Sequence, residues 1–384
     1  MRRLNSITLA AIIALGVISS KDASAQITLI QNAQSFEAQS FDKFIPRPQK
    51  TTRIDYDIWN DLLGEMVLST GPSARKRYGR PNAITGSRFV RGHASAYRLE
   101  GNRIPYSEIR PEFMGMLTEY RKDLERIGTE IDISKLPRNE QLAFWFNLHN
   151  AVMVEQLAKE YPVKRPEDLK IGKPAVQFYD AKIIDIKNTK LSLRDIREKI
   201  VYANWRNPKV IYGFYLGDIG SPSIQNRAFN GSNVNQILNL NAEEFVNSLR
   251  GFHVRNNKQY VSRLYTDVAK FYFPNFDRDV ETHIKKYMRD DVKSQMLNAA
   301  SFSIDRYDPI IADMTAGQGR YKSISSLSST SRSGVSLTGH NTLKQFVNEL
   351  VVKREKLKEL GLYSNGTVIV EDIETDDGSK PEIE

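Results

Sequence analysis

The chain of 384 residues contains no cysteine and only five histidines. The absence of cysteine excludes disulfide bonds, thiolate nucleophiles and cysteine-ligated zinc. No two histidines stand at the spacing of a metal-binding helix, so we expect no metal and no cofactor. Beyond residue 25 no apolar run is long enough for a transmembrane helix. The stability of the fold must therefore come from its core, and 40% of the residues are hydrophobic.

The first 25 residues have the features of a signal peptide. Two arginines precede an apolar run at 7–20, which is too short to span a bilayer. The run is followed by Ala23-Ser24-Ala25, a cleavage site of the small-x-small type. We therefore expect cleavage after Ala25 and an exported protein, located in a bacterial periplasm or secreted from the cell.

Charge is unevenly distributed around a formal total of +9. Residues 71–110 contain nine Arg and Lys residues but only two Glu, whereas residues 371–384 contain seven acidic residues and one Lys. A basic segment attracts anions, and in an exported protein these would be anionic envelope polymers or peptides. No nucleic-acid-binding motif accompanies the charge, so we do not expect nucleic acid as a partner. The alternative is an ordinary basic surface.

Composition also predicts how the chain is organised. Residues 26–53 are polar and show no period, which indicates an extended lead-in to a globular domain at 54–305. Residues 321–341 are rich in Ser, Gly and Thr, as in a flexible linker. A short charged helix is predicted at 342–360, with one apolar side that would dock on the domain or on a protein partner. Residues 361–384 are acidic, and we expect them to be disordered.

The spacing of apolar residues predicts an α+β fold with a single mixed α/β domain. Residues 139–161, between two prolines, present the broad apolar stripe of a central helix. The continuous apolar run at 209–217 predicts a buried strand. Two further segments, 181–193 and 252–264, have the pattern of β-hairpins.

Four motifs occur in order along the chain and carry a resemblance to a known family. They are NEQLAFWFNLHNAVMVEQL (139–157), KLSLRDIREKIV (190–201), NPKVIYGFYLGDIGSPSIQNRAF (207–229) and LYTDVAKFYFPNF (264–276). Together they resemble the family catalogued as domain of unknown function 547, over roughly residues 54–300. The resemblance implies a single mixed α/β domain and no established activity. Members of that family typically carry a His and two Cys in the third motif, which implies a thiol hydrolase or transferase of the papain or transglutaminase kind.

This chain differs from the family at each of those three positions. Ile211 stands in place of the His, while Leu216 and Ser221 stand in place of the two Cys. A thiol mechanism is therefore absent, and we expect a non-catalytic binding protein of the cell envelope. The alternative is a hydrolase or acyl transferase that uses Ser221 with a histidine as its base.

A binding cleft is predicted where the chain leaves the 209–217 run. Ser221 lies at the tip of the turn GDIGSPSIQ, and His149 lies between asparagines on the apolar helix. Polar residues in such surroundings indicate a buried polar site or a cleft wall. The candidate catalytic residues are Ser221 and His149. The candidate cleft residues are Asn147, His149, Asn150, Tyr215, Asp218, Ser221 and Ser223. The alternatives are a turn serine bonded to the backbone and a core histidine bonded to a neighbouring Asn.

Overall fold

The computed structural model describes residues 41–79, 93–298, 301–318 and 338–362. The chain divides into two compact units, residues 1–45 and residues 46–384. The described part of the first unit contains η1 (Asp42–Phe44), one turn of 3-10 helix. The predicted signal peptide and acidic tail lie outside the described residues, apart from the first two residues of the tail. The predicted linker, 321–341, also lies outside them up to residue 337, and its last four residues belong instead to helix α12 (Thr338–Glu359).

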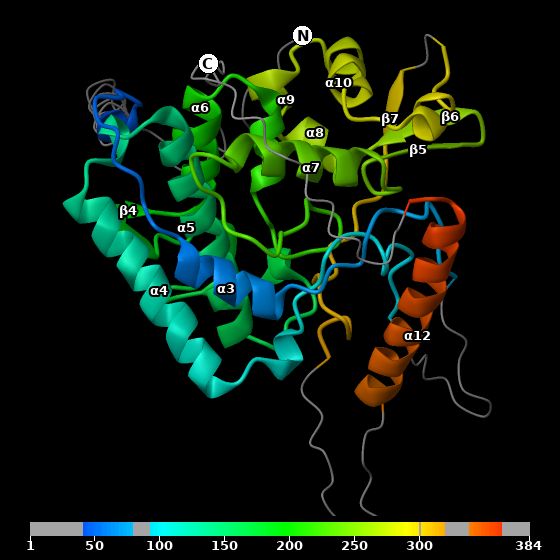
Figure 1. Ribbon diagram of the computed structural model, residues 1–384, viewed down its shortest axis with the longest axis horizontal. Helices are drawn as coiled ribbons and strands as arrows, with labels where there is room; N and C mark the ends of the chain where they lie inside the picture. Colours follow the sequence, from blue (N-terminus) through cyan, green and yellow to red (C-terminus); the bar gives the residue numbers. More distant parts are fainter. Residues whose placement is uncertain (1–40, 80–92, 299–300, 319–337, 363–384) are drawn as a thin grey trace, which may run out of the picture. The chain divides into compact units, whose positions relative to one another are not determined.

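The second unit combines many helices with small sheets (Figure 1). The α-helices are α3 (Asp57–Met66), α4 (Pro111–Glu130), α5 (Arg138–Lys159), α6 (Tyr202–Asn204), α7 (Val234–Val246), α8 (Arg263–Asp267), α9 (Ala269–Tyr272), α10 (Phe276–Lys285), α11 (Asp290–Lys293) and α12 (Thr338–Glu359). The shorter helical segments are η2 (Tyr106–Glu108), η3 (Ile133–Lys135), η4 (Pro166–Asp168), η5 (Phe178–Asp180), the π-helix η6 (Asp195–Val201) and η7 (Pro208–Gly213). This mixture of elements confirms the α+β class. Among the described residues, no helix combines the length and apolar character that crossing a bilayer requires.

Helix α5 confirms the central helix predicted at 139–161. It begins directly after Pro137, and every residue from Glu140 to Glu155 is buried. Helix α4 packs along it. A helix buried on all sides is a core element. Its polar side chains must therefore find hydrogen-bond partners inside the protein.

The strands form three antiparallel pairs, and a further parallel strand extends one of these pairs to a three-stranded sheet. They are β1 (Lys170–Ile171), β2 (Val176–Gln177), β3 (Ile184–Ile186), β4 (Thr189–Leu191), β5 (Phe252–Arg255), β6 (Lys258–Val261) and β7 (Phe302–Ile304). Both predicted hairpins are confirmed. Their two-residue turns, at Lys187-Asn188 and Asn256-Asn257, have positive φ throughout, as a type I′ turn requires. Strand β7, which lies parallel to β6, was not predicted.

The buried strand predicted at 209–217 is wrong. Its first half lies in the 3-10 helix η7 (Pro208–Gly213). In the described part of the chain, none of its residues pairs with a strand, and the isolated bridge that follows it begins at Asp218, just beyond the run. Pro208 has the fixed φ that suits the first turn of a helix. The Asn207 side chain also accepts a hydrogen bond of 3.1 Å from the backbone N–H of Lys209. Both features favour a helical start over an extended one.

Asparagine side chains replace the missing strand partners of this run. Asn241 Nδ2 donates to the carbonyl of Tyr212 (2.9 Å), and Asn150 Nδ2 donates to that of Gly213 (3.0 Å). Asn150 Oδ1 accepts from the N–H of Tyr215 (3.0 Å). The run is buried, as the apolar pattern predicted. A continuous apolar run indicates burial, but it does not distinguish a strand from another buried conformation.

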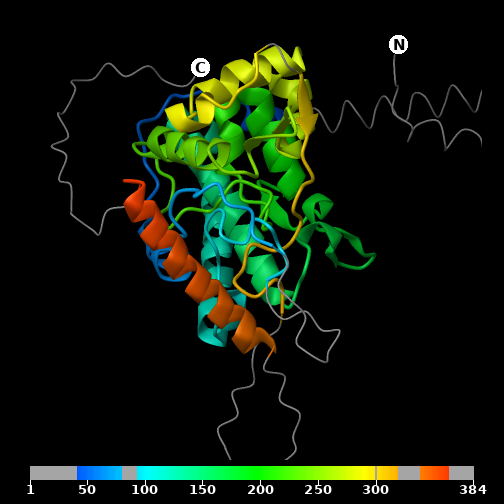
Figure 2. The same cartoon turned by 90° about the vertical axis from the view of Figure 1, so that its right-hand side faces the viewer.

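Helix α12 packs against the segment around Leu99 (Figure 2). Phe346 on α12 forms a small buried cluster with Leu99. Glu349 on the same helix accepts a hydrogen bond of 2.6 Å from Nε of the buried Arg98. The apolar side predicted for this helix therefore docks on the domain, whereas a protein partner for the helix stays a prediction.

Candidate functional site

The polar groups of Ser221 form hydrogen bonds within the turn that carries this residue. Ser221 is fully buried, and its Oγ donates to the carbonyl of Asp218 at 2.9 Å. The backbone N–H of Ser221 donates to Asp218 Oδ1, also at 2.9 Å. In the part of the chain that the structure describes, no histidine is among the hydrogen-bond partners of this hydroxyl. A serine nucleophile needs a base within hydrogen-bond reach, and the described residues place no histidine in that position.

His149 has both ring nitrogens occupied. Its Nε2 lies 3.0 Å from Arg197 Nη1, and its Nδ1 lies 3.1 Å from Asn150 Oδ1. Because a guanidinium can only donate, Nε2 accepts and Nδ1 carries the proton. Burial, reinforced by the charge of Arg197, holds the pKa of His149 well below its usual value. The neutral imidazole thus orients Asn150, which in turn holds the backbone of the 209–217 run.

Three predicted cleft residues do come together, but around a very small space. Asn147, Asn150 and Ser223 line a cavity of about 10 Å³. Asn241 also faces it, and its Oδ1 has no hydrogen-bond partner within the described part of the chain. A polar cavity of this volume accommodates one water molecule. The geometry suits a structural water rather than a ligand.

The remaining cleft candidates, Asp218 and Tyr215, also have protein partners. Tyr307 Oη donates to Asp218 Oδ1 at 2.7 Å, and Tyr215 Oη lies 3.3 Å from Tyr106 Oη. Burial raises the pKa of Asp218 to about 7, against the opposing effect of hydrogen bonds from Tyr307 and Ser221. This carboxyl group therefore titrates near neutral pH within a closed part of the protein.

A much larger pocket, of about 500 Å³, lies beside the carboxyl end of α7. Its walls come from segments that are far apart in the sequence: the loop between Ser69 and Ser73, the second half of α7, and residues 286–289. Asn102, Gln225 and Leu362 complete the lining. Sequence reasoning missed this pocket, because no local pattern shows which distant loops meet. The turn that ends at Gln225 links this pocket to the predicted cleft.

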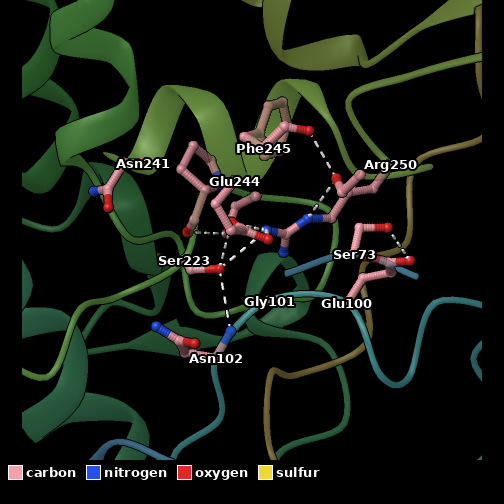
Figure 3. Close-up of polar contacts among 12 residues, drawn as sticks. Ser73, Glu100, Gly101, Asn102, Ser223, Asn241, Glu244, Phe245 and Arg250 are labelled. Carbon is pink, nitrogen blue, oxygen red and sulfur yellow. Dashed lines mark hydrogen bonds and ion pairs between the residues drawn. The ribbon is translucent and has the colours of Figure 1, made fainter. Parts of the chain in front are cut away.

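One wall of the pocket is held by a buried polar network (Figure 3). Ser223 Oγ donates to Glu244 Oε2 (2.9 Å) and accepts from Arg250 Nη2 (2.9 Å) and the N–H of Asn102 (3.2 Å). Arg250 Nη2 also bonds Glu244 Oε1 at 2.6 Å. Arg250 is buried, so Glu244 has a partner whose charge cannot move away into solvent. Ser223 therefore lies behind the pocket wall and fixes it.

Asn247 joins two further walls of the pocket. Its Nδ2 donates to the carbonyls of Glu243 and Tyr287, each at 2.8 Å. Its Oδ1 accepts from the N–H of Arg289 at 2.8 Å. Its own backbone carbonyl accepts a hydrogen bond of 3.0 Å from Arg75 Nη1, which connects α7 to the loop around Arg75 in the basic segment 71–110. The end of α7, the segment after α10 and this loop are thus tied together by one side chain and its backbone.

Part of the basic segment 71–110 serves the interior of the fold. Arg103 is fully buried and donates to four backbone carbonyls. Arg98 is buried against Glu349, and Arg75 bonds the backbone near α7. Three cations of the segment lie in residues 80–92, outside the described residues. An anion-attracting surface here stays a prediction, and it would rest on the other cations.

The comparisons with known proteins give one match. Residues 133–246 match the model of the family described as "Protein of unknown function, DUF547". The matched stretch runs from η3 through α7, so it is shorter than the resemblance over 54–300. No curated protein and no solved structure matches the chain. Among the described residues, no group of three or more acidic or histidine side chains could hold a metal ion.

Proposed function

We propose that this chain is an exported, non-catalytic binding protein of the cell envelope, and that it holds its ligand in the pocket beside α7. The observation that carries the proposal is the pocket itself, at about 500 Å³. This volume lies within the range of small-molecule sites, which are concave and largely preformed. The network behind Glu244 and the bonds of Asn247 support a preformed wall.

The non-catalytic part of the proposal rests on the surroundings of Ser221 and His149. The serine hydroxyl donates to a backbone carbonyl, and the histidine bonds Arg197 and Asn150. Neither group has the geometry of a nucleophile beside its base. The rival function, a serine-dependent hydrolase or acyl transferase, would need both side chains to exchange their present partners.

A pair of variants tests the binding site. Leu240 is 44% exposed and lines the pocket, whereas Val352 is 64% exposed on α12 and does not line it. Leu240→Trp fills the pocket, and Val352→Trp is the matched control. Calorimetry with soluble envelope peptides and anionic polymers should show binding that falls at least tenfold in Leu240→Trp and persists in Val352→Trp. Equal binding by both variants would place the ligand elsewhere and contradict the proposal.

A fluorophosphonate probe tests the absence of catalysis. The mature protein should remain unlabelled, because among the described residues the Ser221 hydroxyl bonds backbone groups and no histidine. Labelling that disappears in Ser221→Ala would overturn the proposal in favour of the hydrolase.

Export has its own test. The leader pattern of residues 1–25 supports it. In a bacterial host, the mature protein should be recovered from the periplasm or the medium with Gln26 as its first residue. A cytoplasmic protein that retains residues 1–25 would show that the leader reading is wrong.

A further inference from the structure

The charges around the pocket define a class of ligand. We propose that the pocket binds a short peptide with free ends, its ammonium group at Glu243 and its carboxylate at Lys286. This inference rests on the proposed binding function and specifies the ligand. It depends on which charged side chains of the pocket are already paired and which are not.

Four charged side chains dominate the lining. Glu244 is paired with the buried Arg250, and Arg289 bonds both oxygens of Asp291 at 3.0 and 3.1 Å. Glu243 and Lys286 are exposed and form no ion pair within the described ranges of the chain. One carboxylate and one ammonium group are therefore available to a ligand.

A ligand with two opposite charges fits this pair better than a neutral one. The hydroxyls of a neutral sugar could hydrogen-bond both groups, but they would leave each charge without an opposite charge once water is displaced, which is unfavourable. A free peptide supplies a charge-assisted partner to each group. The site for the ammonium group also lies in the last turn of α7, where the partial negative charge of the helix end attracts cations.

The backbone segments that carry the two groups are tied together. Asn247 bonds the carbonyl of Glu243 and that of Tyr287, the residue next to Lys286. Burial raises the pKa of Tyr287, and the charge of Glu243 raises it further. Its neutral phenol can donate to the ligand. The backbones that carry the two charges are therefore positioned before any ligand binds.

The size of the pocket limits the length of the peptide. A compact space of about 500 Å³ is about 8 Å across as a cube and about 10 Å as a sphere, whereas an extended dipeptide spans about 7 Å and a tripeptide about 10 Å. Leu240, Met288 and Leu362 supply apolar surface for its side chains. We therefore expect di- and tripeptides, recognised mainly by their ends.

The test uses the tripeptides Ala-Ala-Ala and Ala-Leu-Ala in four forms: free, N-acetylated, C-amidated and blocked at both ends. Calorimetry on the mature chain should show that blocking either end weakens binding tenfold or more, the usual effect of losing a charged hydrogen bond. In Glu243→Gln, acetylation should no longer matter, while amidation still does. In Lys286→Gln the pattern should be reversed. Glu65→Gln and Lys293→Gln, exposed positions outside the pocket, should keep the wild-type pattern.

The outcomes separate this inference from the function on which it rests. If free and blocked peptides bind equally, or if no peptide binds while an envelope polymer binds in a way that Leu240→Trp abolishes, the ligand class is wrong but the binding function stands. If no ligand shows binding that depends on Leu240, both fail.

Discussion

The turn around Ser221 and the pocket beside α7 are built from the same kinds of polar side chain. They differ in how many of these polar groups, and how much space, remain available to a ligand. In the turn, Asn150 and Asp218 satisfy the surrounding backbone and leave a cavity of only about 10 Å³ nearby. In the pocket, Asn247 satisfies the walls, while Glu243 and Lys286 form no ion pair among the described residues, and about 500 Å³ stays open. A polar residue that completes the backbone of its own fold is not available to a ligand.

The family match follows the same division. Residues 133–246 include the whole Ser221 turn, but they include only part of the pocket. The loop after α3, residues 286–289 and Leu362 lie outside the match. The family match therefore covers a buried scaffold, whereas the proposed ligand site also depends on segments that the family model does not cover.

The largest effect should come from breaking the scaffold at Asn150. In Asn150→Leu, the carbonyl of Gly213 and the N–H of Tyr215 lose their partners in the interior. Each buried unsatisfied group costs about 1–3 kcal/mol, so we expect the free energy of unfolding to fall by about 3–4 kcal/mol. Urea unfolding measures it. The control is Asn239→Leu, which is exposed and should change stability by less than about 0.5 kcal/mol. A loss below about 1 kcal/mol at Asn150 would mean that these bonds are not needed.

A side chain introduced at Gly101 should disrupt the polar network behind the pocket wall. Its φ is +74°, and an added Cβ would overlap the guanidinium of Arg250 and the hydroxyl of Ser223. We expect Gly101→Ala to destabilise the protein by about 2–3 kcal/mol and to weaken binding in the pocket. Gly115, in the exposed part of α4, has nothing within 4 Å, so Gly115→Ala should instead stabilise by about 0.5–1 kcal/mol. Similar results for both glycines would show that the Arg250 network tolerates displacement.

Local signals in the sequence were sufficient for some elements. Two prolines and a dense apolar pattern mark α5, and Asn256-Asn257 marks a type I′ turn, because these features act over a few residues. The bond between His149 and its neighbour Asn150 is also local. The run at 209–217 was misread because its partners, Asn150 and Asn241, are distant and use side chains instead of a strand. The pocket could not be predicted, since its walls meet only through long-range packing.

The pH dependence of stability should distinguish the closed turn from the open pocket. The pKa of Asp218 is about 7 in the fold, above its unfolded value near 4. Because the folded state holds the proton more tightly, the contribution of this group to stability is present below pH 4 and is lost as the pH rises through 7. Asp218→Asn keeps an acceptor for Tyr307 and Ser221. It should be more stable than wild type by about 1–3 kcal/mol at pH 8, and nearly equal at pH 4.

Urea unfolding at several pH values measures this difference. A constant gap between the two proteins would show that Asp218 does not titrate in this range. Glu243→Gln is the matched variant in the open pocket, where the carboxylate is exposed, and its stability at pH 8 should differ from that of wild type by less than about 0.5 kcal/mol.

The smallest expected change in stability comes from two serines that stand two residues apart, and only one of them should affect ligand binding. Ser221→Ala removes the hydroxyl that donates to the carbonyl of Asp218 at 2.9 Å and accepts a longer bond of 3.4 Å from the N–H of Leu216, and it should cost about 1 kcal/mol without changing ligand affinity. Ser223→Ala removes the hydroxyl that bonds both Glu244 and Arg250 behind the pocket wall. It should cost a similar amount of stability but also weaken binding, because Glu244 loses part of its support. Calorimetry on both variants makes the comparison. If Ser221→Ala weakened binding as much as Ser223→Ala, the turn and the pocket would be one site.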